Sequence, residues 1–364
     1  MPQALAGLGA RNVLVVTGRV TSRADRVRSA LTAVGVSSVA FGVATEPSID
    51  VVRAAVKMSA EAGCDAVLGF GGGSALDVAK AAAVLAATGA DPVDHLEVIG
   101  AGRPIVKPGL PCVAVPTTAG TGSEVTRNSV LSGSGVKASL RSPLLLPKVA
   151  VVDPDLLVGL PRPTIAASGM DALSQLIEPL LSRRANPFSD ALARDGISRS
   201  ARSLRRAWED GMEDAGVRED LALASLFGGM CLANSGLGAV HGIAAAAGAR
   251  LRAPHGAVCA AVLAAAVQVN AHALRDRAPE HPALPRLAEV ATLLTGRPVA
   301  GPGDAIDWLQ DLTAALSTSG LASYGLDQAQ IAALVSDAQK ASSMRGNPIE
   351  LSDAEVREIL TRSL

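Results

Sequence analysis

The sequence has no long run of charge of one sign. Its 364 residues contain 33 lysines and arginines against 34 aspartates and glutamates, a formal net charge of −1 at pH 7. A protein that binds nucleic acid or anionic lipid usually carries a basic patch or stripe. We therefore expect no nucleic acid and no membrane as partner, and a small molecule as the ligand.

The sequence also lacks paired cysteines and a long apolar run, and we expect no secretory leader. The N-terminal segment MPQALAGLGARNVLVV has no charged region followed by an apolar core and a cleavage site. The most apolar stretch, 257–269, is too short to span a bilayer. The cysteines show no C-x-x-C spacing, which favours free thiols in a reducing compartment. They are Cys64, Cys112, Cys231 and Cys259. We expect a cytoplasmic protein.

The first 160 residues alternate β-branched segments with amphipathic ones, and the strand pattern stops after Pro161. At 364 residues, a chain with 49% apolar residues is expected to form two domains. Strand–helix alternation predicts a parallel, Rossmann-like sheet covered by helices. The predicted domains are an α/β dinucleotide-binding domain (1–160) and an all-helical metal- and substrate-binding domain (161–364), with the site in the cleft between them. The predicted strands are 12–18, 37–42, 65–71, 111–118 and 148–154.

A glycine-rich turn, GGGSALDVAK at 71–80, follows the third predicted strand. The bare backbone at Gly72 and Gly73 would let a pyrophosphate approach the amides that begin a helix. Ser74 and Asp77 have the S-x-x-D spacing of a capping box, and both are also candidates for cofactor contact. The alternative is a tight turn with an ordinary cap. The spacing is not the G-x-G-x-x-G of the usual Rossmann fingerprint, so a different dinucleotide fold is expected.

A second polar loop, PTTAGTGSEVT at 116–126, follows the fourth strand. Ligands of parallel sheets bind beyond the carboxyl ends of the strands, where both loops lie. Hydroxyl groups and glycines at that place suit a phosphate and a ribose. The hydroxyl-bearing candidates for cofactor contact are Thr117, Thr118, Thr121, Ser123 and Thr126.

Asp171, His241 and His255 form a candidate metal site in the helical part of the chain. Aspartate and histidine are suitable ligands for zinc or ferrous iron, and three protein ligands leave room for a substrate oxygen. The two histidines flank one stretch rich in glycine and alanine, HGIAAAAGARLRAPHG. The alternative is that they are ordinary core or capping residues.

With these motifs in order, the chain resembles the iron-containing (group III) alcohol dehydrogenase family almost from end to end. The carrying motifs are GGGSALDVAK, PTTAGTGSEVT, VDPDL, GMDALSQLIEP and GLGAVHGIAAAAGARLRAPHG. The resemblance implies hydride transfer between NAD or NADP and an alcohol or aldehyde, with a divalent metal polarising the substrate oxygen. It also implies metal ligation by Asp171, His241 and His255, and an approach of Lys137 to the nicotinamide ribose. We expect a homodimer.

The chain departs from the family pattern at two histidine positions. The histidine that usually follows the aspartate by four residues is replaced by Gln175, which would share a helix face with Asp171 and could ligate through its amide oxygen. The second histidine of H-G-x-x-H is replaced by Ala245, so proton transfer would need solvent or a ribose hydroxyl. Aligned on NAD-preferring relatives, Phe41 occupies the usual acidic position and Glu46 is the nearest acidic residue, which predicts weak discrimination between NAD and NADP.

Two alternative enzymes remain open. KASLRSPLLLP is similar to the maleylacetate reductase branch, which would reduce an oxo acid without a catalytic metal. A lyase or cyclase of the dehydroquinate-synthase kind shares the fold but needs a basic cluster that the site motifs lack. Arg252 is a candidate to hold a substrate carboxylate if it faces inward, and we expect a small or flexible polar substrate.

Overall fold

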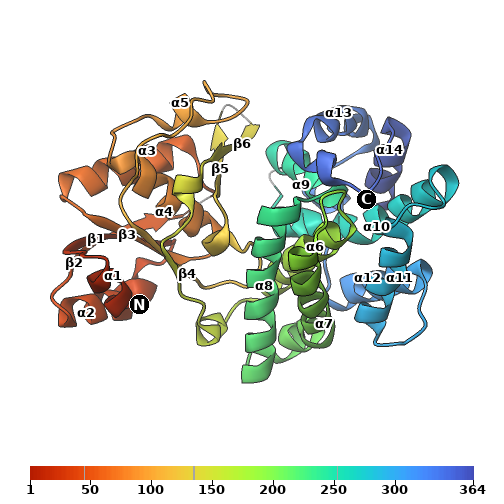
Figure 1. The fold of residues 1–364 in the computed structure, drawn as a ribbon, viewed down its shortest axis with the longest axis horizontal. Coiled ribbons are helices and arrows are strands. Elements are labelled where there is room, and N and C mark those ends of the chain that lie inside the picture. The colour runs from red at the N-terminus through yellow and green to blue at the C-terminus, as the bar shows by residue number, and fades with distance from the viewer. Residues whose placement is uncertain (45, 134–135, 252) are drawn as a thin grey trace. The chain divides into compact units, whose positions relative to one another are not determined.

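The computed structural model describes residues 1–44, 46–133, 136–251 and 253–364. These residues form two compact units (Figure 1). The first unit is Met1–Thr118 with Gly122–Leu156, and the second is Ala119–Thr121 with Leu157–Leu364. The principal division falls close to the boundary expected at 160/161. Arg252, the candidate for holding a substrate carboxylate, lies outside the described residues.

The first unit is built around a parallel sheet of five strands with the order β2-β1-β3-β4-β7. This confirms the predicted α/β fold with a parallel sheet. Four of the predicted strands are reproduced to within two residues at each end, and the fifth, expected over 148–154, is only two residues long. The strands are β1 Asn12–Gly18, β2 Ser37–Val43, β3 Ala66–Gly71, β4 Cys112–Pro116 and β7 Val149–Ala150.

Alternation along the strands divides the core of this unit into two layers. On β1, Leu14 and Val16 belong to one buried cluster, while Val13 and Val15 belong to the other. Successive side chains of a strand point to opposite faces, so a strand buried on both faces reads as a continuous apolar run. The helices of the unit are α1 Pro2–Gly7, α2 Asp25–Ala33, α3 Ile49–Glu61, α4 Gly73–Ala86 and α5 Pro92–His95.

The strand order places a change of direction between β1 and β3. Strand β2 pairs with β1 along one edge of β1, and strand β3 then pairs with β1 along its other edge. In open α/β sheets, ligands bind outside the carboxyl ends of the strands at this switch point. The carboxyl end of β3 is Gly71, the first residue of the glycine-rich turn.

The chain forms a two-stranded antiparallel hairpin after β4 and before β7, which the sequence pattern did not predict. It consists of β5 Asn128–Gly133 and β6 Val136–Arg141. Its sequences, NSVLSG and VKASLR, contain serine, glycine and lysine, which are poor strand formers, so the pattern did not indicate a strand.

The second unit is helical throughout its named elements, apart from short 3-10 turns. Its central helix α6 is buried on every side over its second half and packs against α7, α8 and α10 (Figure 1). A helix that is buried on every side belongs in the interior of its unit, and the buried half of α6 carries Asp171, Gln175 and Glu178 among its apolar residues. The helices are α6 Arg162–Leu181, α7 Pro187–Asp210, α8 Ala215–Ser235, α9 Ala239–Arg250, α10 His255–Arg277, α11 Ala283–Thr295, α12 Pro302–Ala315, α13 Gln328–Lys340 and α14 Asp353–Arg362.

Helix α10 contains the apolar stretch noted in the sequence. At 23 residues it is long and apolar enough to cross a membrane, but 72% of its most apolar window is buried inside the protein. The bent pair α8 and α9 passes the same test of length and composition with a 100° angle between its helices. Burial of this extent is typical of a core helix, which α10 is.

Candidate metal centre and cofactor loops

The glycine-rich turn leads directly from β3 into α4. The N-cap of α4 is Gly72, which has no side chain to cap the first amides. The predicted capping box of Ser74 and Asp77 is therefore wrong: Ser74 is the second residue of the helix, two positions after the N-cap, and its side chain is exposed. A helix N-terminus without a side-chain cap is a ready anion site, and Gly73 begins it.

Asp77 instead ties the second loop and the hairpin to α4. Its carboxylate accepts a hydrogen bond of 2.6 Å from the Ser123 hydroxyl and one of 2.9 Å from the Val130 amide. The fully buried Lys80 lies 3.1 Å from the same carboxylate and donates to the Ser123 carbonyl and to the Thr126 hydroxyl. We predicted cofactor contacts for Ser123, Thr126 and Asp77. In the structure, these side chains are joined to one another and to Lys80 by hydrogen bonds and an ion pair within the protein.

The glycine-rich turn and the threonine-rich loop also contact each other where they leave strands β3 and β4. The Thr117 amide donates to the Gly71 carbonyl over 3.0 Å. A Cβ atom added to Gly72 would lie 3.2 Å from the Thr118 hydroxyl oxygen, which is closer than most such contacts. A side chain at position 72 would therefore narrow the space between the two turns and require Thr118 to shift by a few tenths of an ångström. Thr121, the remaining predicted threonine, belongs to the second unit.

Lys137 lies on the hairpin strand β6 and forms an ion pair with Glu46 at 2.7 Å. Glu46 was the nearest acidic residue to the position that distinguishes NAD from NADP. Phe41, which we predicted at or near that position, lies on the edge strand β2 and is partly buried. The Glu46 carboxylate, the nearest negative charge to the predicted NAD/NADP-distinguishing position, is therefore paired with the Lys137 ammonium group.

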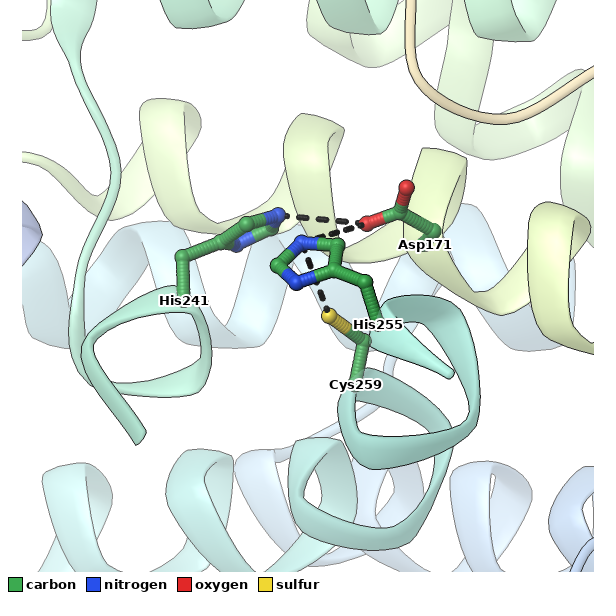
Figure 2. A group of neighbouring side chains, drawn as sticks. All are labelled: Asp171, His241, His255 and Cys259. Atoms are coloured by element: carbon green, nitrogen blue, oxygen red, sulfur yellow. Dashed lines mark hydrogen bonds and ion pairs between the residues drawn. The ribbon is translucent and has the colours of Figure 1, made fainter. Parts of the chain in front are cut away.

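The structure brings together the three predicted metal ligands, each from a different helix (Figure 2). The His241 Nε2 atom lies 3.2 Å from the Asp171 Oδ1 atom, and the His255 Nε2 atom lies 3.7 Å from it. The ring centroids of the two histidines are 5.4 Å apart. Asp171 and His241 are buried, and His255 is partly exposed. Two nitrogen donors thus face one buried carboxylate oxygen.

The sequence around each ligand explains how it is held in place. Asp171 lies in the buried half of α6, and His255 is the first residue of α10. A Cβ atom on the next residue, Gly256, would lie 2.3 Å from the Ala167 carbonyl of α6. A glycine is thus required for the start of α10 to approach α6 so closely.

His241 lies in the first turn of α9 and is oriented by Glu178. The Glu178 Oε2 atom lies 2.5 Å from the His241 Nδ1 atom, and its Oε1 atom accepts from the Val240 amide over 2.7 Å. One carboxylate therefore fixes the histidine ring and caps the helix that carries it. Sequence analysis missed Glu178, although its position seven residues after Asp171 places it on the same face of α6.

The charges of the cluster shift the titration of its members. Burial alone would raise the pKa of Asp171, but His255 and His241 outweigh burial and lower this pKa to about 2. Burial alone would lower the pKa of His241, but Glu178 and Asp171 outweigh it and raise this pKa to about 10. The protein therefore holds a buried carboxylate charge beside a position that favours a cation.

Two further side chains complete the cluster. Cys259 lies one turn after His255 on α10, and its Sγ atom is 3.8 Å from the His255 Nε2 atom (Figure 2). The sequence pattern alone predicts only a buried thiol at Cys259, although its spacing of four from His255 places both residues on one face of a helix. Gln175 is buried and donates to Asp171, as its place on the same face of α6 predicts.

Both parts of the chain match known families. Residues 1–154 match the model of iron-containing alcohol dehydrogenase, and residues 165–364 match that of the C-terminal part of the Fe-containing alcohol dehydrogenase family. The solved structure of a 1,3-propanediol oxidoreductase is similar over 100% of this chain and 95% of its own, with a TM-score of 0.91 and 30% identity.

Two curated relatives are similar in sequence. The 4-hydroxybutyrate dehydrogenase of Cupriavidus necator is 33% identical over 98% of this chain and 93% of its own length. The long-chain-alcohol dehydrogenase 1 of Geobacillus thermodenitrificans is 41% identical over a segment that covers 68% of this chain and 64% of that protein. The chain belongs to the iron-containing alcohol dehydrogenase family of oxidoreductases.

Proposed function

We propose that this enzyme transfers a hydride between NAD(P) and a small alcohol or aldehyde, with one divalent ion held by Asp171, His241 and His255. The observation that carries the proposal is the convergence of these three side chains from α6, α9 and α10 on one buried point. A carboxylate and two imidazoles suit iron or zinc, and three such ligands leave a position for substrate.

The residues present fit such an ion in charge as well as in donor type. The buried carboxylate of Asp171 keeps its negative charge, since its pKa is lowered to about 2. With Nδ1 of His241 hydrogen-bonded to Glu178, its Nε2 atom faces Asp171 and is the nitrogen available to a metal. When bound, the ion would polarise the substrate oxygen and stabilise the charge of the developing alkoxide.

The first unit is proposed to hold the cofactor through the amides that begin α4. Gly72 and Gly73 leave the backbone bare at the carboxyl end of β3, and Ser74 adds an exposed hydroxyl. In alcohol oxidation the substrate carbon loses a hydride to the nicotinamide, and the hydroxyl group loses its proton. Ala245 supplies no acid or base, so the proton is expected to leave through solvent or a ribose hydroxyl.

The substrate is proposed to be a small or flexible alcohol. The similar proteins include a long-chain-alcohol dehydrogenase, a 4-hydroxybutyrate dehydrogenase and a 1,3-propanediol oxidoreductase, whose names all indicate alcohol or aldehyde chemistry. None supports the maleylacetate-reductase-like or the dehydroquinate-synthase-like alternative. The identity of the metal (zinc or iron) and the preference for NAD or NADP stay predictions. The homodimer and the cytoplasmic location also stay predictions.

Replacement of His255 tests the proposal. His255→Ala should lose the bound ion and most of the turnover, because two ligands hold an ion less tightly than three. The matched control is His272→Ala, which removes a histidine from the far end of the same helix. Metal content per chain and aldehyde-dependent NAD(P)H oxidation are measured for both variants. Full metal content and turnover in His255→Ala would overturn the proposal.

A further inference from the structure

The cluster holds a fourth donor that the three-ligand proposal does not use. The Cys259 Sγ atom and the ligand atoms of Asp171, His241 and His255 all lie within 4.8 Å of one another. Cys259 is fully buried, and its spacing of four from His255 places both side chains on one face of α10. Figure 2 shows the sulfur beside the His255 ring that faces Asp171.

The distances among these atoms suit a single shared ion. Metal–nitrogen and metal–oxygen bonds of about 2.0 Å and a metal–sulfur bond of about 2.3 Å give tetrahedral edges of about 3.3 Å and, to sulfur, about 3.5 Å. The two nitrogen–oxygen distances to Asp171 are 3.2 and 3.7 Å, and the sulfur lies 3.8 Å from the His255 Nε2 atom. These three of the six edges lie within about 0.4 Å of the tetrahedral values, and the other three are each no longer than 4.8 Å.

Gln175 is less well placed for the same role. Its Oε1 atom lies on the side of Gly228 in α8, 3.6 Å from where a Cβ of that residue would stand. This oxygen has no hydrogen-bond partner among the described residues. The one atom of Gln175 that could ligate a metal therefore lies against α8.

We propose that Cys259 is the fourth protein ligand of the metal, in place of Gln175. As the metal–sulfur bond forms, the thiol proton leaves to solvent and the thiolate supplies the electron pair. A thiolate is a soft ligand, so the set Asp171, His241, His255 and Cys259 favours Zn²⁺ or Co²⁺ over Mg²⁺ or Mn²⁺. A substrate oxygen would enter as a fifth ligand, an expansion that zinc sites allow.

This inference rests on the proposed metal site, and cobalt spectroscopy separates the two. Co²⁺ is added to the chelated full-length enzyme, and bound cobalt per chain and the near-ultraviolet thiolate-to-cobalt band are recorded. Wild type is expected to bind one Co²⁺ per chain and to show the band. Cys259→Ser and Cys259→Ala should lose the band and bind Co²⁺ about 10- to 100-fold more weakly. The control is Cys231→Ser, which removes another buried thiol of the same unit.

Each outcome decides the inference. One bound Co²⁺ with d–d bands but no thiolate band in wild type would overturn the role of Cys259 and leave the three-ligand site standing. A band that persists in Cys259→Ala would also overturn it. Absence of stoichiometric Co²⁺ would overturn both proposals. If neither Cys259 variant folds, the wild-type spectrum decides, because the only cysteine in the described cluster is Cys259.

Discussion

Glu178 and His241 form the closest contact of the metal cluster: the Glu178 Oε2 atom lies 2.5 Å from the His241 Nδ1 atom, with both side chains buried. A carboxylate on the outer nitrogen of a histidine fixes which nitrogen is available as a ligand. The other carboxylate oxygen of Glu178 caps α9 through the Val240 amide. The local start of α9 and the orientation of the candidate ligand therefore depend on one side chain.

Glu178→Gln should weaken metal binding about 10- to 100-fold, the usual effect of losing such a partner. The amide can still accept from Val240, but it carries no charge to attract the imidazole proton. Competition with a chelator of known affinity gives the dissociation constant. Glu289→Gln, which removes a carboxylate paired with Arg194 elsewhere in the unit, is the control. Equal metal affinity in both variants would limit Glu178 to capping.

Gly72→Val should weaken cofactor binding by about a hundredfold, or about 2.8 kcal/mol. The new side chain would meet Thr118 and fill the approach to the first amides of α4. Quenching of protein fluorescence by NAD(P)H, or calorimetry, gives the affinity, and the melting temperature reports on folding. Gly7→Val is the control, because a side chain at Gly7 meets nothing within 4 Å. Normal cofactor binding by Gly72→Val would make the loop a structural turn only.

The enzyme should use NAD and NADP with less than about a thousandfold difference in kcat/KM, a gap of about 4 kcal/mol. Phe41 carries no charge to repel a 2′-phosphate, and the Glu46 carboxylate is paired with Lys137 at 2.7 Å. Phe41→Asp should shift the preference toward NAD by about tenfold or more, because like charges in contact cost several kcal/mol. Steady-state kinetics with both cofactors measures this. A stronger NAD preference in wild type that Glu46→Gln relaxes would assign the exclusion to Glu46.

Asp220→Asn should destabilise the second unit by about 2 kcal/mol near neutral pH. Asp220 joins α8 to α7, accepting hydrogen bonds from Arg199, Arg202 and Ser203. Burial would raise the pKa of Asp220, but these partners outweigh burial and lower it below 3.8. The stabilisation is therefore present above about pH 4 and is lost as the pH falls through the lower, folded-state pKa.

Urea unfolding of wild type and Asp220→Asn at pH 7 and near pH 3 checks this expectation. The difference in unfolding free energy should shrink at the acidic pH. Asp311→Asn, a change at an exposed aspartate, should leave the free energy nearly unchanged at both pH values. A difference for Asp220→Asn that stays the same at both pH values would show that its charge is not the cause.

The sequence predicted the elements with strong patterns and missed those held by tertiary contacts. β1, β3 and the helices of the second unit have apolar patterns long enough to identify them. The hairpin β5–β6 has a weak pattern, because serine, lysine and glycine occupy much of it. Its attachment to the first unit through Val130 and Asp77 becomes visible only in three dimensions.

The same limit applies to the candidate site. The resemblance placed Asp171, His241 and His255 in one site, and the structure brings them together. Ser74 and Asp77 matched a capping pattern by spacing alone, but α4 begins at Gly73 and Asp77 turns toward Ser123. Glu178 and Cys259 lie one or two turns from a ligand, yet spacing cannot say which neighbour of a ligand points into the site.

The central claim is that one divalent ion, held by Asp171, His241 and His255, is required for turnover. The most direct measurement titrates the exhaustively chelated enzyme with Zn²⁺ or Fe²⁺ while aldehyde-dependent NAD(P)H oxidation is followed. Activity should be near zero at the start, rise linearly and reach its plateau at one ion per chain. Full turnover in the metal-free enzyme would contradict the claim and favour metal-free reduction of an oxo acid.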